Sequence, residues 1–390
     1  MKIRPDPEKY FWLYYFYPLY LVQRPHHISI GLSELGDELI WFRPPRSALG
    51  YLFDRDIKGL LKALLMKPRL ETIELIRGKE IKIFHPRGFY PLPRHLLPKR
   101  ILVRIKRSLL KQTKNLLQPD FILLGWSVLQ DEIILLRSLF PNTKIIFDVV
   151  DDIPGFHENS SFLRDAFFQT LAEADGIISI NQAILTKYSR WIKAPSIIIP
   201  NGVFFEEPPG FALNNTAKIV GYFGAFDFWF DFESLAKIAS MLPKTQFLLV
   251  GPCPRSQRQR MEKVLKLPNI IYHGPVPFEQ IPNILKKIDV LLIPWLPLEV
   301  SQLADPIKIK EALYAGIPVI YFNKTGDPEI DSKIIITSDL SEIVQIIRNN
   351  SLPDPGLRKQ WAELIAQNYS WKVLVNKLRK FCIELSGQQI

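Results

Sequence analysis

The second half of the sequence alternates apolar runs with amphipathic runs at regular spacing, and this pattern constrains the fold more than any other feature. Strands alternating with helices form parallel sheets through βαβ units. We therefore predict a six-stranded α/β domain. The expected strands are 218–223, 246–250, 269–272, 290–294, 318–322 and 334–336, and the expected helices are 232–242, 257–265, 278–287, 306–315 and 340–348.

The first half shows the same alternation. An Asn201-Gly202 turn and a segment rich in Pro, Gly and Asn separate the halves. A chain of 390 residues has room for two domains of ordinary size. We predict two Rossmann-like doubly wound domains, 1–200 and 201–368, with two further helices at 354–368 and 370–386. The expected first-half strands are 10–17, 39–42, 121–124, 144–149 and 176–180, with helices at 24–36 and 57–66.

Composition indicates a globular chain, with 47% hydrophobic and 23% charged residues. Two cysteines are too few for a disulfide framework, which favours a reducing compartment. The apolar run Tyr10–Val22 is too short to span a bilayer and contains Pro18, so we expect a buried strand rather than an anchor or signal peptide. The net charge of +11 indicates an anionic partner: nucleic acid, anionic lipid or a phosphate-bearing substrate.

The stretch 305–320 reads as a helix followed directly by a buried strand. Pro306 suits the first helical turn, Gly316 suits the position just past the end, and Asp305 is a candidate N-cap. Lys308 and Glu311 share one face, near the positive end of the helix. A cation for a pyrophosphate beside a carboxylate for sugar hydroxyls suggests a nucleotide-sugar site. A capped amphipathic helix with a surface ion pair remains the alternative.

Other candidates follow predicted strands, because open α/β sheets bind ligands at the carboxyl ends of strands. Gly224 would let the backbone approach a phosphate, although a glycine there can also serve packing alone. Asp231 is the expected cap of the next helix. Pro294 ends the fourth strand of the second half.

Asp151 and Asp152 follow a buried strand of the first half, where a carboxylate can act as a general base. Neighbouring side chains of an extended segment point in opposite directions, so only one would face a ligand. The other carboxylate would raise the pKa of this base toward neutrality. A solvated loop or helix cap is the alternative.

Gln23–His27 opens a helix after the first strand, where Arg24, His26 or His27 could hold an acceptor; exposed polar residues at a helix start are the alternative. Segment 82–119 contains ten basic residues and no acidic one. Within it, one helical face carries a basic stripe, which predicts contact with an anionic membrane surface. An ordinary surface helix is the alternative, and we expect no nucleic acid because no recognised motif or interleaved aromatic residue is present. The stripe comprises Arg100, Arg104, Arg107, Lys111 and Lys114.

Several motifs, in their order and spacing, resemble the GT-B glycosyltransferases of group 1 (the family 4-like enzymes), which build teichuronic acid and exopolysaccharides. The resemblance covers nearly the whole chain. It implies two Rossmann-like domains facing across a cleft, with residues 369–390 forming a helix that crosses back to the first domain. The motifs are QRPHH (23–27), FDVVDD (147–152), IPNGV (199–203), GYFGA (221–225), WFD (229–231), VGP (250–252), HGP (273–275), DVLLIP (289–294) and DPIKIKEALYAGIPVI (305–320).

The resemblance implies a UDP- or GDP-sugar donor in the second domain and an acceptor in the first. Lys308 would contact the pyrophosphate, Glu311 the ribose or sugar hydroxyls, and Asp151 would be the base. Gly224, Val276, Pro277 and Pro294 would complete the donor site. Neither a metal nor a cofactor is expected, because protein cations would neutralise the leaving diphosphate.

Two departures from the family pattern stand out. Leu303 occupies the place of a Glu eight residues before Glu311, and Ala225 with a run of aromatics replaces an Arg and a Lys. We expect a hexosyltransferase on the cytoplasmic membrane face, with a lipid-linked or polysaccharide acceptor. A nucleotide-sugar epimerase and a non-catalytic sugar- or nucleic-acid-binding protein are the alternatives.

Overall fold

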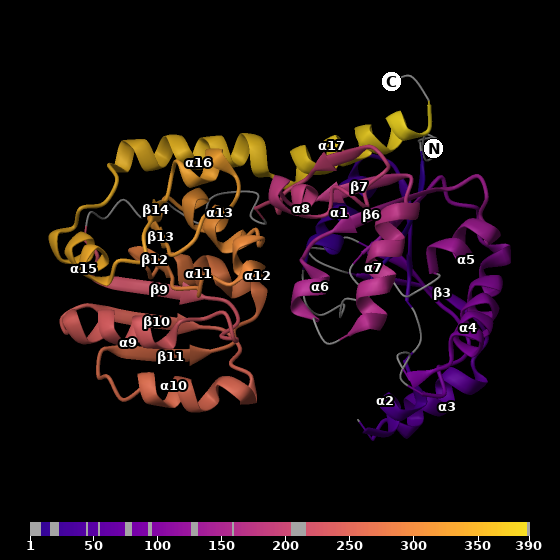
Figure 1. The fold of residues 1–390 in the computed structure, drawn as a ribbon, viewed down its shortest axis with the longest axis horizontal. Coiled ribbons are helices and arrows are strands. Elements are labelled where there is room, and N and C mark those ends of the chain that lie inside the picture. Colours follow the sequence, from indigo (N-terminus) through magenta and orange to yellow (C-terminus); the bar gives the residue numbers. More distant parts are fainter. Residues whose placement is uncertain are drawn as a thin grey trace, which may run out of the picture. The chain divides into compact units, whose positions relative to one another are not determined.

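The computed structural model divides the chain into two compact units (Figure 1). Unit 1 comprises residues 1–180, 184–199 and 375–390, and unit 2 comprises 181–183 and 200–374. The structure describes residues 9–15, 23–43, 46–53, 55–74, 80–92, 96–125, 132–157, 160–203 and 216–387. The predicted strand 10–17 and the proline-rich segment after Asn201 lie partly outside these ranges.

Unit 1 contains an eight-stranded sheet in the order β3-β4-β2-β1-β5-β6-β7-β8, parallel except for the β3–β4 pair. The short central strands are buried along almost their whole length because they are continuous apolar runs, as parallel strands covered on both faces must be. The strands are β1 Tyr10–Tyr14, β2 Glu38–Phe42, β3 Arg69–Glu74, β4 Glu80–His85, β5 Phe121–Leu124, β6 Lys144–Val149, β7 Gly176–Ser179 and β8 Ser196–Ile198.

The helices of unit 1 connect these strands, and the end of the chain returns to the same unit. Gly31 of α1 packs against Val375 of α17, and Arg379 pairs with buried Asp37 at 2.8 Å. The helices are α1 Arg24–Glu34, α2 Ala48–Phe53, α3 Ile57–Leu65, α4 Lys99–Lys111, η2 Gln112–Asn115, α5 Glu132–Leu139, α6 Ile153–Phe156, α7 Ser161–Glu173 and α8 Gln182–Lys187; α17 spans Trp371–Leu385.

Unit 2 contains a six-stranded sheet in the order β11-β10-β9-β12-β13-β14, with every pair parallel. This is the Rossmann order. Its first three strands are added toward one side of the sheet and the next three toward the other, so the strand order reverses between the first and fourth strands of the unit. The strands are β9 Ile219–Phe223, β10 Gln246–Val250, β11 Ile270–Gly274, β12 Val290–Ile293, β13 Val319–Tyr321 and β14 Ile335–Ile336.

The predicted α/β class and all six strands of the second half are confirmed. Asp231 caps α9 by accepting the N–H groups of Glu233 and Ser234, and Gly316 has a φ of 73° just past α13. The helices are α9 Phe232–Met241, η3 Arg255–Gln257, α10 Arg258–Val264, η4 Phe278–Gln280, α11 Ile281–Leu285, α12 Glu299–Gln302, α13 Ile307–Tyr314, α14 Pro328–Asp331, α15 Leu340–Asn349 and α16 Pro355–Tyr369.

The expected cap of α13 is wrong. Pro306 occupies the N-cap position, and no side chain caps this helix. The carboxylate of Asp305 instead forms a buried ion pair with Lys310. Asp305 thus anchors the helix through a side chain in its second turn rather than through its free N–H groups.

Every helix in the described ranges is too short or too polar to cross a lipid bilayer.

The contact between α1 and α17 gives a testable prediction. A Cβ added to Gly31 would lie 2.8 Å from a methyl carbon of Val375. We expect Gly31→Ala to destabilise unit 1 by about 1–3 kcal/mol through overpacking, seen as a lower urea unfolding midpoint. Adding Val375→Ala should make the combined loss clearly smaller than the sum of the single losses. Additive losses would contradict the close contact.

Candidate active site

The candidate site of unit 2 lies where the strand order of its sheet reverses, at the carboxyl ends of β9 and β12. Gly224 directly follows β9, and Pro294 directly follows β12. The Pro294 carbonyl accepts the backbone N–H of Asp231 at 2.7 Å, which ties the end of β12 to the start of α9. Topological switch points of this kind are where open α/β sheets bind ligands.

Lys308 reaches this point from α13. Its ammonium lies 4.5 Å from the centre of the Trp295 ring and 5.1 Å from that of Tyr222. A Cβ on Gly224, where φ is 136°, would stand 2.8 Å from the Lys308 Nζ. Only glycine fits both this conformation and this close approach. The structure therefore brings together Gly224 and Lys308, two of the residues predicted for the donor site.

Hydrogen bonds fix the two rings beneath Lys308. The Trp295 indole N–H donates to the Tyr222 hydroxyl at 3.1 Å, and that hydroxyl donates to the Ala225 carbonyl at 2.9 Å. Rings held in this way attract a cation through their π faces, an interaction that strengthens when the cation is desolvated.

A second glycine supports the first. A Cβ on Gly251, after β10, would lie 2.0 Å from the Gly224 carbonyl oxygen. The Tyr272 hydroxyl donates to the Gly251 carbonyl at 2.8 Å. Val276 and Pro277 follow β11 along the same sheet edge; Val276 is half-buried and Pro277 is exposed. These two residues form an open rim rather than part of the core.

The charges at this site have unusual pKa values. Burial lowers the pKa of Lys308 to about 8, against the opposing attraction of Glu311. Burial also raises the pKa of Glu311 to about 7, against the attraction of Lys308. The Glu311 side chain is only 3% exposed, and its Oε1 has no hydrogen-bond partner within the described residues. Buried polar atoms normally have partners, so this oxygen indicates a missing donor.

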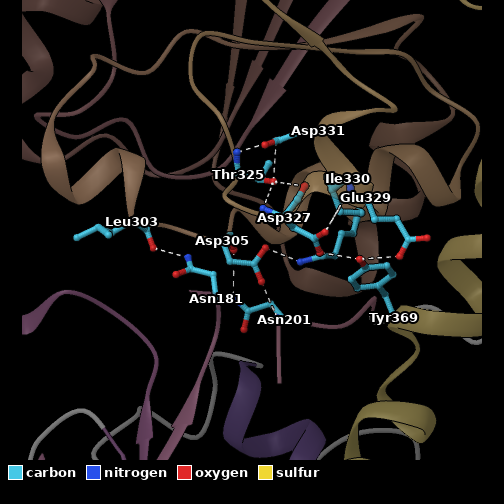
Figure 2. Close-up of polar contacts among 11 residues, drawn as sticks. Asn181, Asn201, Leu303, Asp305, Thr325, Asp327, Glu329, Ile330, Asp331 and Tyr369 are labelled. Atoms are coloured by element: carbon cyan, nitrogen blue, oxygen red, sulfur yellow. Dashed lines mark hydrogen bonds and ion pairs between the residues drawn. The ribbon is translucent and has the colours of Figure 1, made fainter. Parts of the chain in front are cut away.

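Figure 2 shows how the start of α13 is anchored. The Asp305 carboxylate accepts the backbone N–H of Asn201 at 2.7 Å, and the Asn201 side chain donates back to the Asp305 carbonyl at 3.1 Å. Lys310 pairs with the same carboxylate and lies 5.2 Å from the centre of the Tyr369 ring. The loop before Lys308 is thus held by the segment that leads into unit 2.

In unit 1, the structure distinguishes the two candidate carboxylates after β6. Asp152 is buried; it caps α6 through Gly155, pairs with Lys187 at 2.8 Å and accepts the Tyr188 hydroxyl. These contacts make it a structural residue. Asp151 is only half-buried, and no hydrogen bond to its carboxylate is found within the described ranges.

The pKa of Asp151 is raised to about 7, mainly by burial and further by Asp152 and Asp148, while Arg24 lowers it. A carboxyl group that titrates near neutrality can accept a proton in a reaction at physiological pH. The geometry therefore favours Asp151 over Asp152 as the base, and its catalytic role stays a prediction.

The predicted acceptor residues of α1 are all buried. Arg24 donates two hydrogen bonds of 2.9 Å to Asp148, which also accepts the Tyr15 hydroxyl at 2.8 Å. The His26 ring packs at a tilt of 55° against Trp41, and burial lowers its pKa to about 4, so its ring is neutral. Arg24 is thus held against the Asp148 carboxylate, which suits a residue that positions the site. Acceptor binding by Arg24, His26 and His27 remains a prediction.

The basic stripe lies on α4 and the short η2 helix that follows. All five of its side chains are exposed, whereas Leu102 and Leu109 on another face are buried against Tyr90. Lys106 is also buried and pairs with Glu132 at 3.4 Å. Within the described part of the chain, no three His, Cys, Asp or Glu side chains are grouped so that they could hold a metal ion.

Comparisons with known proteins show the family of this chain. The family model described as "Glycosyl transferases group 1" matches residues 217–350. TuaH of Bacillus subtilis strain 168, described as a teichuronic acid biosynthesis glycosyltransferase, is 30% identical over 325 residues, which cover 77% of this chain and 76% of TuaH. The chain belongs to the group 1 glycosyltransferases.

Solved structures show the fold of this glycosyltransferase. Sucrose-phosphate synthase from Thermosynechococcus elongatus is 14% identical with a TM-score of 0.68, covering 97% of this chain and 100% of that one. HepE of Anabaena, solved with UDP and glucose, is 14% identical with a TM-score of 0.65 at the same coverage. TarM is 11% identical with a TM-score of 0.65, covering 99% and 100%. The predicted GT-B class with two Rossmann-like domains is confirmed.

Sequence reasoning gave no specific role to three residues of this candidate site: Tyr222, Trp295 and Gly251. Gly251 follows a strand, which was the available signal for it. The two aromatic residues gave no comparable signal, because an aromatic residue near a strand end is more often part of the core.

The raised pKa of Glu311 predicts a pH-dependent effect on stability. A carboxyl with a higher pKa in the folded state loses its stabilising contribution as pH rises from about 4.5 through about 7. Glu311→Gln removes this loss, so we expect the variant to melt at a higher temperature than the wild type at pH 8 and at a similar temperature at pH 4.5. The exposed Glu262→Gln is the matched control. A pH-independent difference would contradict the burial of an uncompensated carboxylate.

Proposed function

We propose that this enzyme transfers a hexose from a UDP- or GDP-sugar to a hydroxyl group of a lipid-linked or polysaccharide acceptor. The observation that carries the proposal is the arrangement of Lys308 and the unpartnered Glu311 oxygen above the Gly224 turn. A donor diphosphate would supply the anion that Lys308 lacks, and a ribose or sugar hydroxyl would supply the donor that Glu311 lacks. The structures of HepE in complex with UDP and with UDP-glucose support this class of donor.

In the proposed reaction, the acceptor hydroxyl oxygen attacks the anomeric carbon of the donor sugar. Its proton passes to the Asp151 carboxylate, whose raised pKa suits it to that task. The bond between the anomeric carbon and the diphosphate oxygen breaks, and the nucleoside diphosphate leaves. Lys308 and the backbone at Gly224 stabilise the charge that develops on the leaving group, so the reaction needs no metal ion.

An aspartate base that removes the acceptor proton favours inversion at the anomeric carbon. In this scheme, Arg24 is paired with Asp148 at 2.9 Å, and Val276, Pro277 and Pro294 complete the donor site. His26 and His27 lie at the start of α1, and we assign them to the acceptor side.

We further propose that the enzyme works at the cytoplasmic face of the cell membrane. The exposed basic stripe of α4 would attract anionic headgroups while the apolar face of this helix stays packed in unit 1. TuaH is described as a teichuronic acid biosynthesis enzyme, and building such a polymer requires sugar transfer to a growing glycan.

The roles of Asp151 and Lys308 can be separated by experiment. We expect Asp151→Asn to reduce transfer by about 10²–10⁴-fold while binding of the nucleoside diphosphate is unchanged. Lys308→Met should weaken that binding by roughly tenfold or more, because a charge-assisted contact is lost. A screen of UDP- and GDP-sugars that follows nucleoside diphosphate release is the assay, and the exposed Asp165→Asn is the control. Unchanged transfer in both variants would refute the site.

The membrane proposal predicts the effect of charge reversal on α4. We expect Arg100→Glu, Arg104→Glu and Arg107→Glu together to reduce binding to phosphatidylcholine vesicles that contain phosphatidylglycerol by at least roughly tenfold. The matched control reverses Lys244, Lys263 and Lys266, which are exposed on unit 2. Equal vesicle binding by both triple variants would count against a membrane role for α4.

A further inference from the structure

Unit 1 contains a basic pocket that the proposed reaction does not use. Its volume is about 290 Å³, close to the lower end of the range of about 300–1,000 Å³ for small-molecule sites. Among the described residues, six cationic side chains line it, with His85 and one carboxylate, Asp56. The cations are Arg43, Arg46, Lys62, Lys67, Arg69 and Arg87.

The described residues do not balance the positive charges that line this pocket. Asp56 already accepts the backbone N–H of Gly59 at 2.8 Å as the cap of α3. Arg69 is paired with Glu71 at 2.9 Å. Within the described ranges, no carboxylate lies at ion-pair distance from Arg43, Lys62 or Lys67. The pocket therefore has a surplus of positive charge, which suits a ligand with more than one negative charge.

Several contacts hold the walls of the pocket in place. The Arg87 guanidinium donates to the Leu64 carbonyl at 2.9 Å, and the Gly88 N–H donates to the Ala63 carbonyl at 3.0 Å. The Gln112 side chain forms two hydrogen bonds with the backbone of Arg87, at 2.7 and 2.9 Å. The loop after β4 is thus tied both to α3 and to the end of α4.

A second, independent observation concerns the outer surface of α2 and α3. None of the side chains of these two helices is buried. On α3, Ile57, Leu61, Leu64 and Leu65 share one face, and all four are exposed. Phe53 at the end of α2 is 82% exposed. An exposed apolar helix face beside a strongly basic pocket is typical of a helix that lies in the interface of a membrane.

The sheet places the pocket relative to Asp151. Arg43 follows β2, the loop 86–88 follows β4, and Asp151 follows β6; these strands are parallel, so all three sites lie at one sheet edge. The ends of β2 and β6 are three strand spacings apart, which is ~14 Å at about 4.8 Å per spacing. A ligand in the pocket would leave room for a short glycan between it and Asp151.

We propose that this pocket binds the diphosphate of a lipid-linked acceptor while the apolar faces of α2 and α3 enter the membrane interface beside it. This inference rests on the proposed function, because it identifies the acceptor as a lipid diphosphate that carries a short glycan. The surplus cations hold the diphosphate at the level of the headgroups. The lipid chain stays in the bilayer next to Phe53 and α3, and the glycan extends along the sheet edge toward Asp151.

Vesicle flotation with the full chain tests this inference. Three vesicle types are compared: phosphatidylcholine alone, phosphatidylcholine with a long-chain polyprenyl diphosphate, and phosphatidylcholine with phosphatidylglycerol at a matched zeta potential. We expect the polyprenyl diphosphate vesicles to bind the protein most tightly. Equal binding to both anionic vesicle types would overturn the inference, because it would indicate attraction by surface charge alone.

Two variants locate the site of binding. Arg43→Gln, Lys62→Gln and Lys67→Gln together should weaken binding to the polyprenyl diphosphate vesicles by about fivefold per charge, on the order of 100-fold in total. Phe53→Ser, Leu61→Ser and Leu65→Ser together should abolish it. The matched controls, Lys244→Gln with Lys263→Gln and Lys266→Gln, and Leu265→Ser with Ile271→Ser and Leu357→Ser, change exposed residues of unit 2 and should bind like the wild type. Wild-type binding by either the pocket variant or the apolar-face variant would overturn the inference.

A parallel measurement keeps this inference distinct from the proposed function. Thermal stabilisation by UDP and GDP reports on unit 2. We expect the pocket variant and the apolar-face variant to retain it, which would also show that both are folded. If nucleotides stabilise the wild type and polyprenyl diphosphate vesicles do not bind it, the inference fails and the donor site stands. If neither nucleotide stabilises the wild type, the proposed donor site fails.

Discussion

The candidate site of unit 2 depends on the contacts of the partly buried Lys308 with two aromatic rings and with the Gly224 backbone. Lys308 reaches its position only because Gly224 has no Cβ, and Gly224 keeps its conformation only because Gly251 has none beneath it. The Trp295–Tyr222 hydrogen bond then fixes the rings that receive the ammonium. Residues from four segments of the sequence therefore fix the place of one positive charge. Its pKa shows that the protein itself does not fully compensate for the burial of this charge.

Carboxylates in the two units follow the same electrostatic rule with different outcomes. Asp148 is buried and receives Arg24 and Tyr15, while its near neighbour Asp151 receives neither. Burial raises the pKa of Asp151, which lacks these contacts, toward neutrality. Glu311 repeats the second case in unit 2. Carboxyl groups with different surroundings can therefore take structural and reactive roles within one fold.

Much of the fold could be predicted because its signals are local. Continuous apolar runs marked the buried strands, Gly316 marked the end of α13, and Asp231 marked the start of α9. The parts that could not be predicted depend on contacts between distant residues. Asp305 reads as a cap until Lys310 and Asn201 are seen to share its carboxylate. Likewise, the cations of the basic pocket are spread over residues 43–87, and they come together through the folding of α3 and the pairing of β4 with β2 and β3. Whether Asp151 or Asp152 is the freer carboxylate depended on Lys187 and Tyr188, 35 and 36 residues away.

The anchoring of Asp305 has a consequence for where the second unit can be cut. The family model matches residues 217–350, yet the Asn201 amide that holds Asp305 lies before this segment. Val203 also lies before this segment, and its N–H donates to the Tyr369 carbonyl at 2.8 Å. Tyr369 lies beyond the other end of the segment, and its hydroxyl donates to Asp327 at 2.6 Å. A fragment trimmed to the matched segment would contain Lys308 and Glu311 without the braces that set their helix in place. The autonomous donor module is therefore longer at both ends than the stretch that identifies it.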